Sequence, residues 1–217
     1  MNAHNYITLK EKGWIEFYSG SSDSELLEIA SKIGEIQKHP NGQMIFSLKP
    51  KLEYESVNGT FSNICGLRDF PLHTDMAFSK KPARYVLMHS KNSNSCDTTL
   101  LPKNDFWDLL SNSEKYNAER AIYLVRTKTV FFYTSFIFNE NSETGIKYDS
   151  TCMFPFNKYA KEFDPCLKKV ISEIEPLNLK WTDGKTIVID NWINLHGRKS
   201  AFNDIGRELK RIYINKI

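Results

Sequence analysis

Phe70-Pro71-Leu72-His73-Thr74-Asp75 is the stretch of this chain that decides most about its fold, because it places a His-x-Asp pair in an extended segment. Alternate side chains of a strand share a face, so His73 and Asp75 are expected to point the same way, roughly 6–7 Å apart along the strand. The pair alone is weak evidence for a metal site, since 26 of 217 residues are Asp or Glu and five histidines give about 0.6 such pairs by chance. A second segment has to support it.

That segment is Asp190-Asn191-Trp192-Ile193-Asn194-Leu195-His196-Gly197-Arg198, whose histidine follows His73 by 123 positions (196 − 73). Two imidazoles and one carboxylate are the ligands of a metal site that keeps open coordination positions. We therefore predict that His73, Asp75 and His196 bind one metal ion. Taken singly, His196 could be a turn residue and His73 a strand-end residue with a satisfied hydrogen bond.

The C-terminal segment Arg207-Glu208-Leu209-Lys210-Arg211-Ile212-Tyr213-Ile214 predicts a last strand. One face of that strand would carry Arg207, Leu209, Arg211 and Tyr213. Two arginines on a buried face require anions, and a guanidinium binds a carboxylate in a planar, bidentate manner. The alternative is that both arginines form ordinary salt bridges on an edge strand.

These segments resemble the iron(II)- and 2-oxoglutarate-dependent dioxygenases of the taurine dioxygenase and clavaminate synthase-like family. Residues 62–77 look like the strand with the proximal histidine and the acid, and residues 190–198 look like the strand with the distal histidine. Residues 207–213 are similar to the Arg-x-x-x-Arg ending of that family. The likeness runs from Lys12-Gly13-Trp14 to the C-terminus and is faint between 112 and 181, where such folds vary the insert that covers the substrate.

The resemblance implies a role for each residue. Iron(II) would be held by His73, Asp75 and His196, and the distal carboxylate of 2-oxoglutarate by Arg207. A threonine about 25 residues after the first histidine often assists that carboxylate, so Thr98 is expected there, with Thr99 as the alternative. The second arginine of the ending often binds an anionic group of the substrate, so Arg211 is expected to do so; the alternative is a salt bridge to a wall carboxylate.

The activity that the resemblance implies is hydroxylation of an unactivated C–H bond by O2, coupled to conversion of 2-oxoglutarate to succinate and CO2. The substrate class it favours is a small polar metabolite, amino-acid-like or anionic, often in a biosynthetic pathway. Two other functions stay open at this point. One is a non-catalytic metal-binding cupin-like barrel, and the other is a metal-dependent isomerase or hydrolase, for which Arg207 would be superfluous.

Length and composition agree with a single oxygenase domain over residues 1–217. The net charge of +3 is too small to indicate a nucleic-acid surface, so the expected partner is a small molecule, possibly tethered to a carrier protein. The four cysteines form no Cys-x-x-Cys pair, the N-terminus lacks a secretory pattern, and no apolar run approaches a membrane span. The expected location is the cytoplasm, without membrane attachment.

Periodicity predicts many strands and few helices, which favours a mainly β fold with flanking helices, a double-stranded β-helix or cupin-like jelly roll. Strands are predicted over 85–89, 121–125, 129–138, 186–190 and 207–214. Helices are predicted over 22–34, 104–110 and 114–120, and a further one from an Asp164-Pro165 start to Pro176. His89 is expected in the barrel wall, and His39, before Pro40, in a surface turn.

Overall fold

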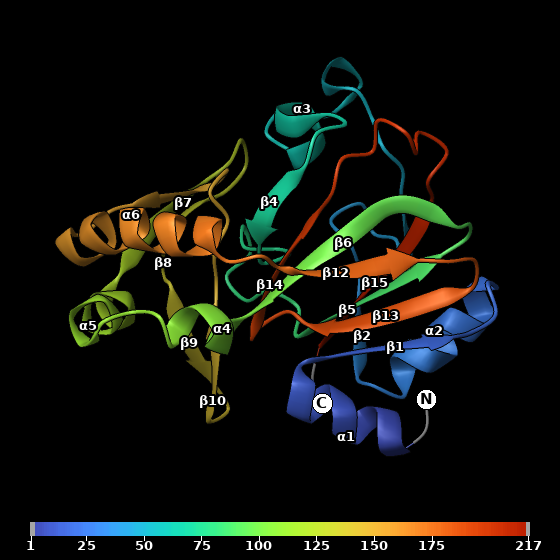
Figure 1. The fold of residues 1–217 in the computed structure, drawn as a ribbon, viewed down its shortest axis with the longest axis horizontal. Coiled ribbons are helices and arrows are strands. Elements are labelled where there is room, and N and C mark those ends of the chain that lie inside the picture. The colour runs from blue at the N-terminus through green and yellow to red at the C-terminus, as the bar shows by residue number, and fades with distance from the viewer. Residues whose placement is uncertain (1–2, 216–217) are drawn as a thin grey trace.

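Two antiparallel sheets form the centre of the molecule (Figure 1). The computed structural model describes residues 3–215. The larger sheet has the order β1-β13-β5-β15-β2, with β3 also paired to β15, and its strands are Trp14–Tyr18 (β1), Glu35–Gln37 (β2), Phe46–Leu48 (β3), Tyr85–Ser90 (β5), Lys185–Asp190 (β13) and Leu209–Asn215 (β15). The second sheet has the order β12-β6-β14-β4, and its strands are Phe70–His73 (β4), Asn94–Pro102 (β6), Leu177–Trp181 (β12) and Asn194–Arg198 (β14).

Strand alternation explains how the larger sheet is buried on both faces. Val86 and Met88 of β5 face inward, where they join a core cluster with Leu100 and Trp181 of the second sheet. Leu87, between them, faces outward into a cluster formed with helices α1 (Ala3–Lys12) and α2 (Asp23–Ser31). The α2 helix begins as predicted, with the Ser22 hydroxyl accepting the Glu25 N–H.

A second group of elements lies at the end of the sheets away from α2 (Figure 1). It contains two small sheets, β11-β7-β8 and β10-β9, formed by Ile122–Arg126 (β7), Phe131–Ser135 (β8), Ile137–Glu140 (β9), Glu143–Ile146 (β10) and Met153–Pro155 (β11). Its helices are Lys103–Trp107 (α4), Asn112–Arg120 (α5) and Lys158–Glu173 (α6). The short elements η1 (Glu53–Glu55) and α3 (Phe61–Cys65) precede β4.

The jelly-roll prediction is confirmed, with three local corrections. The strand predicted over 129–138 is two strands, because the chain turns inward at the fully buried Phe136. Helix α6 begins at Lys158 with Asn157 as its N-cap, so Pro165 lies inside it and not at its start. The burial of Phe163 and Leu167 offsets the hydrogen bond that the proline cannot donate. Finally, Arg207 precedes β15, which begins at Leu209.

Within residues 3–215, no helix is both long enough and apolar enough to span a membrane.

Candidate active site

The two predicted histidine ligands are cross-strand neighbours. Strands β4 and β14 pair antiparallel, and His196 stands directly opposite His73 in their register. The ring centroids lie 4.8 Å apart, and both side chains are buried. The fold therefore joins two residues that are 123 positions apart in the sequence, because β4 and β14 are adjacent in the second sheet.

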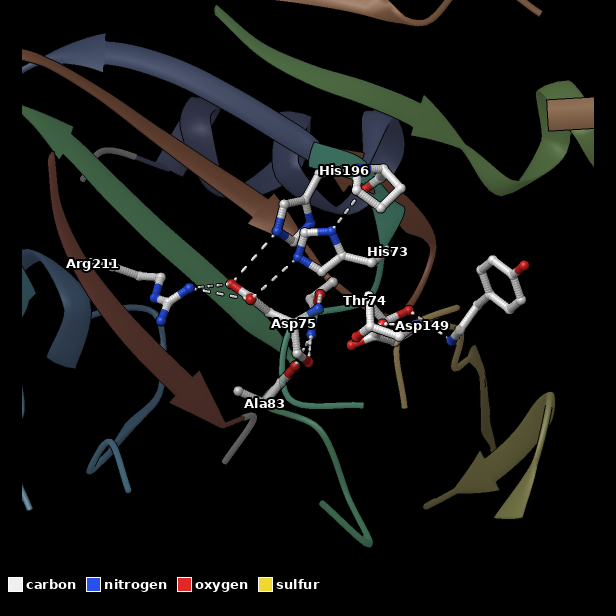
Figure 2. Close-up of polar contacts among 11 residues, drawn as sticks. His73, Thr74, Asp75, Ala83, Asp149, His196 and Arg211 are labelled. Atoms are coloured by element: carbon white, nitrogen blue, oxygen red, sulfur yellow. Dashed lines mark hydrogen bonds and ion pairs between the residues drawn. The ribbon is translucent and has the colours of Figure 1, made fainter. Parts of the chain in front are cut away.

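Asp75 completes the cluster from a turn and not from the strand. Strand β4 ends at His73, and the backbone then bends through Met76, whose φ is +60°. The Asp75 Oδ1 lies 3.6 Å from His73 Nε2, and its Oδ2 lies 3.5 Å from His196 Nε2 (Figure 2). The side chain of Asn191 fixes this turn, accepting the Asp75 N–H at 2.9 Å and donating to the Asp75 carbonyl at 3.0 Å.

These three side chains fit a metal ion. Their ligand atoms all lie within 4.8 Å of one another, and a metal with nitrogen or oxygen ligands about 2.1 Å away at right angles needs them roughly 3 Å apart. The His73 Nδ1–H donates to the Pro71 carbonyl at 2.9 Å, which leaves the Nε2 lone pair facing Asp75. The His196 Nδ1 has no hydrogen-bond partner in the described chain.

Electrostatics keeps the carboxylate charged. Burial opposes the ionisation of Asp75, but Arg211 and the two histidines outweigh it and hold its pKa well below the usual range. The Arg211 guanidinium donates to both Asp75 oxygens, at 3.2 Å and 3.1 Å (Figure 2). Arg211 thus contacts the predicted metal ligand itself and not a separate wall carboxylate. Its Nε has no partner in the described residues, and the Arg211 side chain borders the cavity.

Arg207 is a buried cation without an anion. It is 5% exposed and borders the same cavity, yet no hydrogen bond or ion pair of its guanidinium occurs within residues 3–215. Burial lowers its pKa to about 10, so it remains charged at neutral pH. The neighbouring Arg198 is different, because it donates to the carbonyls of Gly66 and Arg68 at 2.9 Å and 2.7 Å. Arg207 is therefore the guanidinium available to an incoming carboxylate.

The register of β6 and β14 separates the two threonines. Thr98 is paired with Arg198 and lies on the face that lines the cavity. Thr99 is paired with Gly197 on the opposite face, where a Cβ on Gly197 would come within 2.8 Å of the Thr99 hydroxyl. Since Trp181 Nε1–H donates to the Thr98 hydroxyl at 3.1 Å, the Thr98 proton is free to be donated elsewhere. This geometry favours Thr98 over Thr99.

The structure corrects the prediction that His39 lies at the surface. It is 4% exposed and not at the surface, because the turn after β2 folds back over β15. Its ring lies 4.4 Å from that of Tyr213, and its Nε2–H donates to the Arg211 carbonyl at 3.0 Å. Burial and the Arg211 charge lower its pKa to about 4. No local signal in the sequence indicates this contact, whereas the prediction that His89 is a wall residue is confirmed by its full burial.

The cavity above the cluster has a volume of about 480 Å³. Segment 39–62 supplies the largest part of its wall, including Phe46 and Phe61. From residues 112–181, where the substrate-covering insert was expected, Asp149, Thr151 and Cys152 are the described residues that border it. The main cover of this site therefore precedes the first histidine ligand.

Solved structures share this fold. An asparagine oxygenase in complex with Fe(II), 2S,3S-3-hydroxyasparagine and succinate superimposes with a TM-score of 0.77 at 15% identity, covering 98% of this chain and 78% of its own. The non-heme iron oxygenase OrfP with Fe and α-ketoglutaric acid gives 0.75 at 15% identity, covering 100% and 81%. A taurine dioxygenase from Burkholderia xenovorans gives 0.74 at 13% identity, covering 100% and 82%.

No protein-family profile matches the sequence, and no curated protein does so either. At identities of 13% to 15%, the likeness to these structures establishes a common fold. The function has to be argued from the side chains.

Proposed function

We propose that residues 1–217 form one iron(II)- and 2-oxoglutarate-dependent oxygenase domain that hydroxylates a small polar metabolite. The observation that carries the proposal is the pairing, in one cavity, of a metal-ligand cluster with the unpartnered guanidinium of Arg207. A metal-binding barrel without catalysis gives no reason to bury that cation, and neither does a hydrolase or isomerase. A dicarboxylic co-substrate does, since its distal carboxylate would neutralise Arg207.

His73, Asp75 and His196 would hold the iron through the two Nε2 atoms and a carboxylate oxygen. When bound, the iron with 2-oxoglutarate and O2 supplies the oxidising power for C–H hydroxylation, with succinate and CO2 as the other products. Three protein ligands would leave coordination positions for the co-substrate and O2. The backbone contacts of His73 and Asn191 hold the ligands in place before any ion binds.

Arg207 and Thr98 would orient the co-substrate. A guanidinium presents two parallel N–H groups to a carboxylate, and the Thr98 hydroxyl can add a third donor because its oxygen already accepts from Trp181. Burial strengthens these contacts, since water competes little inside the cavity. Co-substrate binding would also remove the cost of the unpaired charge.

Arg211 would meet the primary substrate. It lies on β15 beyond Leu209, with its guanidinium at the metal-ligand carboxylate and its Nε unpartnered. An anionic group of the substrate placed there would lie beside the iron. The solved structures that share the fold include complexes with hydroxylated asparagine and hydroxylated arginine, which supports a small amino-acid-like or anionic substrate here. The four free thiols fit a reducing, cytoplasmic location.

The test is turnover of the co-substrate. Protein supplied with Fe(II), ascorbate, O2 and 2-oxoglutarate is expected to release succinate, and a screen of small metabolites is expected to find compounds that accelerate the release. Complete absence of 2-oxoglutarate turnover, with and without such compounds, would reject the function. Metal binding in that case would point to a non-catalytic barrel.

A further inference from the structure

Asp149 is a buried carboxylate that borders the cavity and has no cationic partner. It is 6% exposed, and no ion pair within residues 3–215 involves it. Apart from Asp75, it is the acidic residue of the described chain that lines the cavity. A buried charge without a counter-charge is costly, and its presence in a cleft indicates a ligand that supplies the missing charge.

The partners of Asp149 orient it without neutralising it. Its Oδ1 accepts the Thr151 N–H at 2.8 Å and the Thr151 hydroxyl at 2.6 Å. Burial and the nearby Asp149 carboxylate raise the pKa of the Cys152 thiol. The nearest lysine in the sequence, Lys147, is engaged elsewhere, because its ammonium donates to the carbonyls of residues 79–80. All the donors to Asp149 are therefore neutral.

The backbone fixes Asp149 beside the metal-ligand segment. Thr74, which lies between His73 and Asp75, donates its N–H to the Tyr148 carbonyl at 2.7 Å and accepts the Tyr148 N–H on its hydroxyl at 3.2 Å. Asp149 follows directly. In Figure 2, Asp149 and Arg211 lie to either side of Asp75. An anion-binding group and a cation-binding group thus flank the carboxylate that would hold the iron.

The other cations of the cavity have different roles or places. Arg207 is assigned to the co-substrate, Arg198 is bonded to backbone carbonyls, Lys49 is paired with Glu208 at 3.2 Å, and Lys51 is exposed to solvent. We propose that Asp149 binds a protonated amine or guanidinium of the primary substrate, while Arg211 binds its anionic group. The substrate is then a zwitterion of the amino-acid type and not a simple organic acid. This inference rests on the proposed function and specifies its substrate class.

The first test compares matched compounds. The probes are the common L-amino acids and the corresponding 2-hydroxy acids, which lack the ammonium group, and the readout is accelerated succinate release. Compounds that accelerate it are expected to carry a cation, and Asp149→Asn is expected to lower kcat/KM for them at least 50-fold. A 2-hydroxy acid without any cationic group that is as effective as its amino acid would overturn the proposal. A kcat/KM of Asp149→Asn within threefold of that of the original protein would also overturn it.

The second test needs no substrate. Asn keeps the acceptor for Thr151 but removes the unpaired charge, so Asp149→Asn is expected to raise the Tm by about 2–4 °C. The matched control is Asp164→Asn, because Asp164 is equally buried but paired with Lys168 at 2.7 Å; its Tm is expected to fall. A lower Tm for Asp149→Asn would make the carboxylate part of the scaffold and overturn the proposal. Failure of the function itself would show differently, as absence of 2-oxoglutarate turnover by the unaltered protein.

Discussion

Arg207→Lys is the substitution that best separates co-substrate binding from the rest of the site. The Arg207 guanidinium makes no hydrogen bond to the described chain, so none of its donors is engaged by the protein. Lysine retains the charge but replaces the two-pronged contact with a point charge. Losing one charge-assisted hydrogen bond costs about 1.5–3 kcal/mol, which is roughly 10- to 150-fold in affinity.

The assay is the apparent KM for 2-oxoglutarate, measured by succinate release, beside that for 2-oxopentanoate, which lacks the distal carboxylate. Arg207→Lys should weaken 2-oxoglutarate binding within that range and change 2-oxopentanoate little. Arg126→Lys is the matched control, since Arg126 is exposed on β7, over the Phe154 ring. An equal rise in the apparent KM for both acids would refute the assignment of Arg207 to the distal carboxylate.

Three further predictions concern neighbouring residues. Arg211→Ala should raise the KM for the primary substrate at least 30-fold and that for 2-oxoglutarate less than threefold; the reverse pattern would move Arg211 to the co-substrate. Gly197→Ala should destabilise the protein by about 1–3 kcal/mol and weaken iron binding, because the new Cβ would lie 2.5 Å from the Phe70 carbonyl oxygen, between the strands that carry both histidines; an unchanged Tm would contradict this. The pKa of His39 is about 4 in the folded protein, against an ordinary value of 6.5, so the folded state binds fewer protons at this residue than the unfolded state does. The contribution of His39 to the free energy of unfolding is therefore complete above pH 6.5 and is lost as the pH falls to 4. His39→Phe should abolish that part of the pH dependence, at most about 3 kcal/mol, in denaturant titrations from pH 4 to 7, and an identical slope in both proteins would exclude it.

The pairing of His73 with His196 follows from the sequence because both lie in segments with clear strand character and recognisable neighbours. The placement of Asp75 does not. Alternation predicts it on the same strand, whereas the strand ends at His73 and a residue at positive φ turns the chain. That turn depends on Asn191, a residue 116 positions away whose side chain bonds both backbone groups of Asp75. Long-range contacts of this kind leave no local pattern.

Long-range contacts also decide the cavity wall. The sequence predicts His39 as a turn residue before Pro40, and only the fold places its ring against Tyr213. The register of β6 with β14 distinguishes Thr98 from Thr99, which the spacing from His73 leaves open. Local patterns therefore predict which residues carry the chemistry. Tertiary packing decides which of them face one another.

The most direct test of the central claim is anaerobic titration of the protein with Fe(II) and 2-oxoglutarate, followed by visible absorption. We expect a charge-transfer band at one iron per chain, lost in His196→Ala and shifted to higher 2-oxoglutarate concentration in Arg207→Lys. The band should also fail to form with Asp75→Ala, since that variant lacks the carboxylate ligand. No band in the unaltered protein, or a band that survives loss of His196, would contradict the account.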